Sequence, residues 1–160
     1  MTKIKHLFLL LCIAGCFAAC TKDSTYVDNF DYEGQFKTDT ALIRKFITDN
    51  KIPAIKDKSG VFYQVLAPGT GTVVYNKATQ ITFNYEGKLL NGTVFDSNTD
   101  ATKPSVFALG NLILGWQYGI PYIQKGGKIR MFIPSYYGYG NAASNKIPAN
   151  SVLDFTVTLQ

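Results

Sequence analysis

Two neighbouring stretches of the sequence decide the fold, Gly115-Trp116-Gln117-Tyr118-Gly119-Ile120-Pro121 and Ile133-Pro134-Ser135-Tyr136-Tyr137-Gly138-Tyr139-Gly140. The first contains the only tryptophan of the chain, and the second contains its densest group of tyrosines. Glycine and proline recur every few residues, so no long helix or strand can run through either stretch. The first suits a short helix that holds its ring against a sheet, and the second predicts a loop. A buried tryptophan with purely structural tyrosines would leave the same pattern, so the surrounding sequence has to discriminate.

Strand-like patterns surround these stretches, because the hydrophobic period there is close to two. They cover residues 61–66, 81–86, 94–97, 106–109, 128–133 and 153–160. A turn at Pro68-Gly69-Thr70-Gly71 closes the first, and Asn91-Gly92 predicts a hairpin between the second and third. Several short strands, antiparallel turns and one central helix predict an α+β domain over residues 61–160, with a wrapped antiparallel sheet.

A helix is expected over residues 38–50, before the domain, followed by a linker to residue 60. Thr38 or Asp39 can cap its start, and Pro53 prevents its continuation. Its apolar residues fall on one face: Leu42, Ile43, Phe46 and Ile47. Such a helix could dock on the domain or mediate a dimer, and docking is the favoured interpretation.

The charge pattern gives no sign of a nucleic-acid partner. The formal net charge is +5, which becomes +3 when Lys3 and Lys5 of the N-terminal segment are set aside. The remaining lysines are scattered among acidic residues, which is typical of a solvated surface rather than a basic stripe.

The N-terminus has the pattern of a lipoprotein signal over residues 1–19. Lys3 and Lys5 precede an apolar run that is too short to span a bilayer comfortably. Small residues then lead to Cys20, which resembles the lipidated cysteine of bacterial lipoproteins, with a polar tether to residue 37. Cys16 fits the same pattern, but polar residues follow Cys20 directly, so Cys20 is preferred. An ordinary cleaved signal with an incidental cysteine is the alternative.

Processing at Cys20 would restrict the chemistry of the mature chain. It would leave no free thiol and would remove His6, the only histidine. Ser-His and Cys-His catalysis, thiolate zinc sites and disulfide scaffolds are then excluded. Any activity must come from carboxylates, hydroxyls, lysines, backbone amides or shape.

A series of motifs in the domain resembles the FKBP family of peptidyl-prolyl isomerases. In chain order they are Asn84-Tyr85-Glu86-Gly87-Lys88-Leu89, Gly92-Thr93-Val94-Phe95-Asp96-Ser97, Phe107-Ala108-Leu109-Gly110, Ile113-Leu114-Gly115-Trp116, Tyr137-Gly138-Tyr139-Gly140, Ile147-Pro148 and Val152-Leu153-Asp154-Phe155. Each piece alone is weak, whereas the ordered set is specific and covers about residues 60–160. The resemblance implies an antiparallel half-barrel curled around one short helix, with an apolar pocket between them.

The resemblance also implies roles for particular residues. Trp116 would form the floor of the pocket, and the Tyr139 hydroxyl and the Ile113 backbone N–H would each bond a carbonyl of a bound Xaa-Pro segment. The carboxylate of Asp96 would lie at the rim. The walls would be formed by Tyr85, Phe95, Ile113 and Phe155, with Phe107, Leu112 and Ile147 as further substrate-binding positions.

Three departures from the family pattern affect only the rim. Ser105 stands where the family prototype has a pocket phenylalanine, and Phe107, two residues on, shares its face of the strand. Ala101 stands where some members carry an arginine near the pocket aspartate. The loop between Gly140 and Ile147 is short and carries no aromatic residue or histidine.

The implied activity is peptidyl-prolyl cis-trans isomerisation without metal or cofactor. The expected partners are proline-containing polypeptide clients, and macrolide inhibitors are candidate ligands. The expected location is the cell envelope of a Gram-negative bacterium, anchored to the outer membrane through the lipid on Cys20. Two alternatives remain open: a proline-recognising chaperone or adaptor with little turnover, and a lipoprotein that uses the fold only as a scaffold.

Overall fold

The computed structural model describes residues 29–160. The expected signal segment, the lipidation site Cys20 and most of the tether lie outside the described residues. Within residues 29–160, the helices are too short or too polar to cross a membrane.

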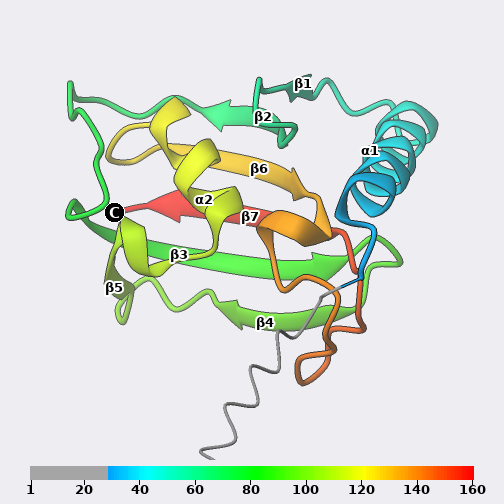
Figure 1. The fold of residues 1–160 in the computed structure, drawn as a ribbon. Helices are drawn as coiled ribbons and strands as arrows, with labels where there is room; N and C mark the ends of the chain where they lie inside the picture. The colour runs from blue at the N-terminus through cyan, green and yellow to red at the C-terminus, as the bar shows by residue number, and fades with distance from the viewer. Residues whose placement is uncertain (1–28) are drawn as a thin grey trace, which may run out of the picture.

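The described chain forms a seven-stranded antiparallel sheet (Figure 1). The strands are β1 (Ile55–Lys56), β2 (Phe62–Ala67), β3 (Gln80–Leu89), β4 (Val94–Asn98), β5 (Ser105–Ala108), β6 (Lys128–Ile133) and β7 (Leu153–Leu159). Their order across the sheet is β1-β2-β6-β7-β3-β4, with β5 paired to the other end of β3. All pairs are antiparallel, and Asn91-Gly92 forms the predicted hairpin between β3 and β4. The α+β prediction is confirmed.

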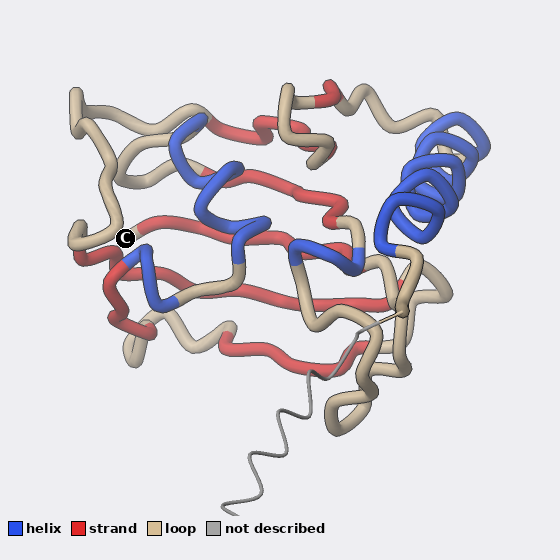
Figure 2. Tube along the Cα trace, in the orientation of Figure 1, coloured by secondary structure: helices blue, strands red, loops and turns tan. Residues whose placement is uncertain are grey.

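The short helix α2 (Leu114–Gly119) lies across one face of the sheet (Figure 1). Two glycines permit this close approach, because a Cβ added to Gly115 would overlap Ile133 Cγ2 and one added to Gly119 would overlap Met131 Sδ. Three 3-10 turns complete the connections: η1 (Leu109–Asn111), η2 (Ile120–Tyr122) and η3 (Ser135–Tyr137). Figure 2 shows how short these helical pieces are beside the strands.

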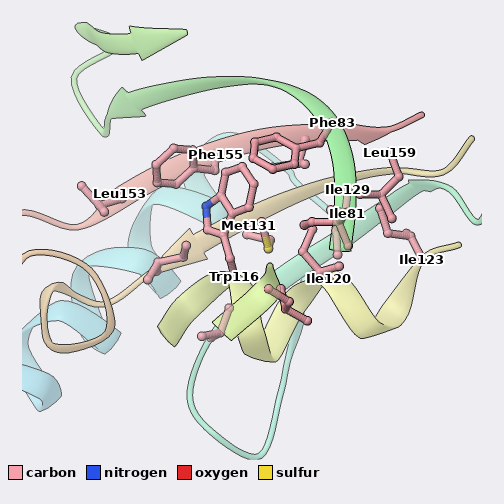
Figure 3. Packing of buried hydrophobic residues seen from close by; sticks show 14 of the residues in the cluster. Ile81, Phe83, Trp116, Ile120, Ile123, Ile129, Met131, Leu153, Phe155 and Leu159 are labelled. Carbon is pink, nitrogen blue, oxygen red and sulfur yellow. The ribbon is translucent and has the colours of Figure 1, made fainter. Parts of the chain in front are cut away.

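The main hydrophobic core fills the space between α2 and the sheet (Figure 3). Trp116 and Ile120 enter it from the helical side, and alternate residues of the central strands enter from the sheet. The period-two pattern therefore predicted the correct face. On β7, for example, Phe155 and Val157 are buried, whereas Thr156 between them is partly exposed.

The N-terminal helix is longer than the sequence predicted. Helix α1 runs over Tyr32–Asp49, so it begins within the segment expected to be a tether, and neither Thr38 nor Asp39 caps it. The cap is Asp31, whose Oδ1 accepts a hydrogen bond of 2.8 Å from Gly34 N. Asp39 lies inside the helix and is completely buried.

Helix α1 docks on the domain, as favoured from its apolar face. Ile43 is fully buried in a second hydrophobic cluster with Phe62, Phe132 and Val152. The ring of Phe46 lies 5.7 Å from that of Phe132, centroid to centroid. The helix covers one end of the sheet, beside η3 (Figure 1).

Candidate active site

Four of the predicted site residues form a continuous group of aromatic rings. The Trp116 ring lies 5.3 Å from that of Phe155 and 5.7 Å from that of Tyr85, and Phe95 meets Phe155 at 5.4 Å, all as centroid distances. These contacts are edge-to-face, which is a favourable arrangement of aromatic quadrupoles. Because α2, β3, β4 and β7 each contribute one ring, the site depends on the whole half-barrel being assembled.

Asp96 is held at the edge of this group by Tyr85. The Tyr85 hydroxyl donates a hydrogen bond of 2.6 Å to Asp96 Oδ2, and the carboxylate is exposed. Burial and the bonded carboxylate together raise the pKa of Tyr85 far above its ordinary value, so the phenol remains a donor. Nearby on β4, the Asn98 side chain donates hydrogen bonds to Lys103 O and Ser105 Oγ.

The two predicted donors, Ile113 N–H and the Tyr139 hydroxyl, lie unpaired at this site. Within residues 29–160, neither group donates a hydrogen bond. Tyr139 is 42% exposed, and its pKa is raised, first by burial and then by the negative charge of Asp96, which places it near that carboxylate. Both groups are therefore available to an external acceptor.

The segment that carries Ile113 is fixed by helix α2. Gln117 Nε2 donates to Leu112 O at 2.8 Å, and Ile113 O accepts from Trp116 N at 3.0 Å. Leu112 and Ile113 pack partly buried against the main core, and Ile147 is 6% exposed in the same core. The predicted positions Leu112 and Ile147 thus belong to the same hydrophobic core as Trp116.

Phe107 is not brought into the ring group. It is 50% exposed at the sheet edge, and its ring lies 6.3 Å from that of Phe83, centroid to centroid. Ser105 accepts a hydrogen bond from Asn98, so this position carries a polar contact where the family prototype has a phenylalanine ring. Phe107 therefore does not compensate for Ser105 at the position of the rings.

Phe83 was missed as a site residue, although it supports Trp116 directly. The two rings lie 4.9 Å apart edge to face, and Phe83 is 2% exposed (Figure 3). The signal was present, since Phe83 precedes Tyr85 by two residues on one strand and therefore shares its face. Trp116 Nε1 is also buried and lacks a hydrogen-bond partner among the described residues.

Two hollows lie mostly apart from this group. One of about 600 Å³ spans the opposite face of the sheet, bordered by polar residues such as Arg130 and Asp154, and reaches Tyr85. Another of about 570 Å³ lies between α1 and η3. Trp116, Phe95 and Phe155 line neither of them, and these three rings are almost fully buried in the core.

A family model described as FKBP-type peptidyl-prolyl cis-trans isomerase matches residues 71–160, more than half of the chain. The chain belongs to the FKBP family. The match begins at Gly71, whereas β2 pairs with β6 in the same sheet, so the folded unit of this FKBP-family member extends beyond the matched region. Helix α1 lies entirely before it.

Relatives in the family include two proteins named FkpA. The chain is 46% identical over 104 residues to the FKBP-type peptidyl-prolyl cis-trans isomerase FkpA of Buchnera aphidicola subsp. Schizaphis graminum, covering 65% of this chain and 41% of that protein. It is 40% identical over 101 residues to FkpA of Escherichia coli K12, covering 63% and 37%. The chain thus spans about two fifths of the length of these relatives.

Solved structures share the FKBP fold. The crystal structure of FkpA from Escherichia coli superposes with a TM-score of 0.64 at 32% identity, covering 79% of this chain and 62% of that chain. The crystal structure of AtFKBP13 superposes with a TM-score of 0.59 at 34% identity, covering 66% and 95%.

Proposed function

We propose that the protein is a peptidyl-prolyl cis-trans isomerase that accelerates rotation about Xaa-Pro bonds in polypeptide clients. The observation that carries the proposal is the pair of unpaired donors, Ile113 N–H and the Tyr139 hydroxyl, beside the Trp116 ring group. Membership in the FKBP family supports it.

The chemistry of the reaction suits a site that has no acid–base pair. Rotation about an amide bond has a barrier of about 18–20 kcal/mol and breaks no covalent bond. Twisting the amide removes its resonance, and with it much of the charge separation between oxygen and nitrogen. A planar amide is therefore better solvated by water than a twisted one. A dry aromatic surface destabilises the planar form relative to the transition state.

The residues of the site would divide this work. The proline ring would lie on the buried Trp116, with Phe95 and Phe155 beside it. The Ile113 N–H and the Tyr139 hydroxyl would each donate to a carbonyl oxygen of the client and fix its orientation during rotation. Asp96, held by Tyr85, would keep an acceptor at the rim.

Macrolide inhibitors are proposed as ligands of the same surface. They would occupy the aromatic group and the same two donors. Because Ser105 and the half-exposed Phe107 leave the edge of the ring group without an aromatic side chain, we expect weaker macrolide binding than in members with phenylalanine at the position of Ser105.

We further propose that Cys20 is lipidated and anchors the protein in the cell envelope of a Gram-negative bacterium, at the outer membrane. Small residues before Cys20 and polar residues after it support this assignment. Mass spectrometry of the mature N-terminus tests it. A diacylated Cys20, absent from a Cys20→Ser variant, is expected, and an unmodified N-terminus after another residue would refute it.

The isomerase proposal is tested by NMR exchange between the cis and trans forms of a short Xaa-Pro peptide. The purified wild-type protein at catalytic concentration should accelerate exchange, and Tyr139→Phe should reduce this effect. Tyr136→Phe is the matched control, because this exposed tyrosine lies in the same loop outside the ring group. Absence of acceleration by the folded wild type would refute isomerase activity and favour the adaptor alternative.

A further inference from the structure

We propose that Asp39, on the N-terminal helix α1, is a positioning residue that holds the loop carrying Tyr139 in its working conformation. This inference rests on the isomerase function proposed above. It makes α1, which lies outside the region matched by the FKBP family model, part of the catalytic unit of this chain.

Asp39 makes a buried connection between α1 and η3. It is 0% exposed, and its Oδ2 accepts two hydrogen bonds from Ser135, one from the backbone N at 2.8 Å and one from Oγ at 2.6 Å. Its Oδ1 accepts a third hydrogen bond, of 2.7 Å, from Gln35 Nε2. The carboxylate is therefore well supplied with donors, as a buried acidic group must be.

Ser135 in turn organises the loop that follows it. Its carbonyl oxygen accepts hydrogen bonds from Gly138 N and Gly140 N, both at 2.9 Å. These two glycines flank Tyr139, so one residue held by Asp39 fixes the backbone on both sides of the catalytic tyrosine. Gly140 has a φ of +70°, and its carbonyl accepts from Asn150 N at 2.9 Å, which completes the turn.

The hydrogen bonds between Asp39 and Ser135 are not needed to dock α1 on the sheet. The apolar contacts of Ile43 and Phe46 with Phe132 already hold α1 on the sheet. A buried carboxylate is seldom the best way to gain stability, since an apolar group of similar size often serves equally well. Its directional bonds do, however, fix geometry, and the geometry that they fix here is that of the Tyr139 loop.

Four variants test the proposal in the purified full-length protein. Asp39→Leu removes every acceptor, whereas Asp39→Asn retains a carbonyl oxygen for Ser135. Ser135→Ala removes only the hydroxyl contact and keeps the bond from the backbone N. Ile43→Ala weakens helix docking through the apolar face and leaves the Ser135 contact intact.

Asp39→Leu is expected to lower kcat/KM about 10-fold, mainly through kcat, because small displacements of a catalytic group are costly. Asp39→Asn should restore most of the activity, Ser135→Ala should lose less than Asp39→Leu, and Ile43→Ala should retain wild-type kcat/KM below its unfolding temperature. If Asp39→Leu does not fold, Ser135→Ala carries the test, and a wild-type kcat/KM in this variant together with unchanged amide exchange at Gly138 and Gly140 would overturn the proposal.

A double-mutant cycle with Tyr139→Phe separates positioning from general stability. If Asp39 acts through the Tyr139 hydroxyl, Asp39→Leu should lower kcat/KM by a much smaller factor in the Tyr139→Phe background than in the wild type. An equal factor in both backgrounds, or an equal loss in Ile43→Ala, would overturn the proposal.

Amide hydrogen exchange gives a readout independent of catalysis. Asp39→Leu should speed exchange at Gly138 and Gly140, whose N–H groups bond Ser135 O, more than Ile43→Ala does. An inactive wild type would overturn the isomerase function and the contribution of Asp39 to it together, while these amides would still report whether Asp39 holds the loop. An active wild type with unchanged activity and exchange in Asp39→Leu would overturn the role of Asp39 alone.

Discussion

Replacing Gly87 by alanine should disturb the ring group, because the added methyl group would collide with two of its rings. Gly87 lies on β3, opposite Phe155 of β7 and Asp96 of β4. A Cβ placed there would lie 2.6 Å from Phe155 Cε1 and 2.6 Å from Phe95 Cζ. Carbon atoms normally stay about 3.5–4.0 Å apart, so both rings would have to move by about 1 Å. The backbone angles of Gly87 do not require glycine, so the effect is steric.

The free energy of unfolding should fall by about 1–2 kcal/mol. Overpacking a core costs about 1–3 kcal/mol, and the lower backbone entropy of alanine in the unfolded chain offsets about 0.4–1 kcal/mol of it. Urea unfolding should show a midpoint lowered by roughly 0.5–1 M, given a typical dependence of about 1–3 kcal/mol per M. Because Phe95 and Phe155 are displaced, kcat/KM should fall about 10-fold as well.

A second substitution provides the control for this reasoning. Phe95→Leu removes the ring edge that meets the new methyl group, so Gly87→Ala should be less destabilising in that background, with a coupling of about 1 kcal/mol. If Gly87→Ala unfolds within about 0.5 kcal/mol of the wild type and keeps its kcat/KM, the contact distances do not govern the site and the argument fails.

Three further predictions concern the donors, the tyrosine pKa values and helix α1. Tyr139→Phe should lower kcat/KM by roughly 3- to 10-fold, the contribution of one hydrogen bond, with an unchanged urea midpoint; an unchanged rate would remove Tyr139 from the mechanism. The pKa values of Tyr85 and Tyr139 are raised in the folded protein, so as the pH rises these tyrosines ionise first in the unfolded chain. The free energy of unfolding should therefore decline above about pH 10, and urea titrations across that pH range would detect the decline. Stability that stays constant up to about pH 11 would contradict these shifts. Ile43→Ala should lower the free energy of unfolding by about 2–5 kcal/mol, because this fully buried side chain joins α1 to the sheet; a loss below about 0.5 kcal/mol would mean that α1 is not docked in solution.

The sheet and the central helix could be predicted because their signals are local, whereas the members of the ring group followed from the resemblance to the FKBP family. Alternation along residues 81–86 and 153–160 identified the buried face, and Gly115 and Gly119 indicated a helix in close contact with a sheet. The hydrogen bond between Tyr85 and Asp96 could not be predicted, since it depends on the relative position of β3 and β4 across a bulged pairing. The exposed position of Phe107 likewise depends on where β5 ends at the sheet edge.

The start of α1 was misplaced for a different reason. Thr38 and Asp39 were both candidate caps, because threonine and aspartate side chains commonly accept the free N–H groups at the start of a helix. Asp39 nevertheless precedes Ile43 by four residues and therefore shares its buried face, a signal that polarity obscured. Its partner Ser135 lies 96 residues away, and no local pattern can indicate such a contact.

The order of strands bears on how the chain acquires its structure. β7 is the last described strand along the chain, yet it lies in the middle of the sheet between β6 and β3. During synthesis the earlier strands therefore lack their central neighbour until β7 is made, and α1, which is made before the sheet, lacks its contacts with Phe132 and Val152. Such long-range pairing slows folding and favours a late, concerted assembly. An isomerase of this design would become active only after β7 had been made, and until then it would be, like its clients, an unfolded polypeptide with prolines of its own.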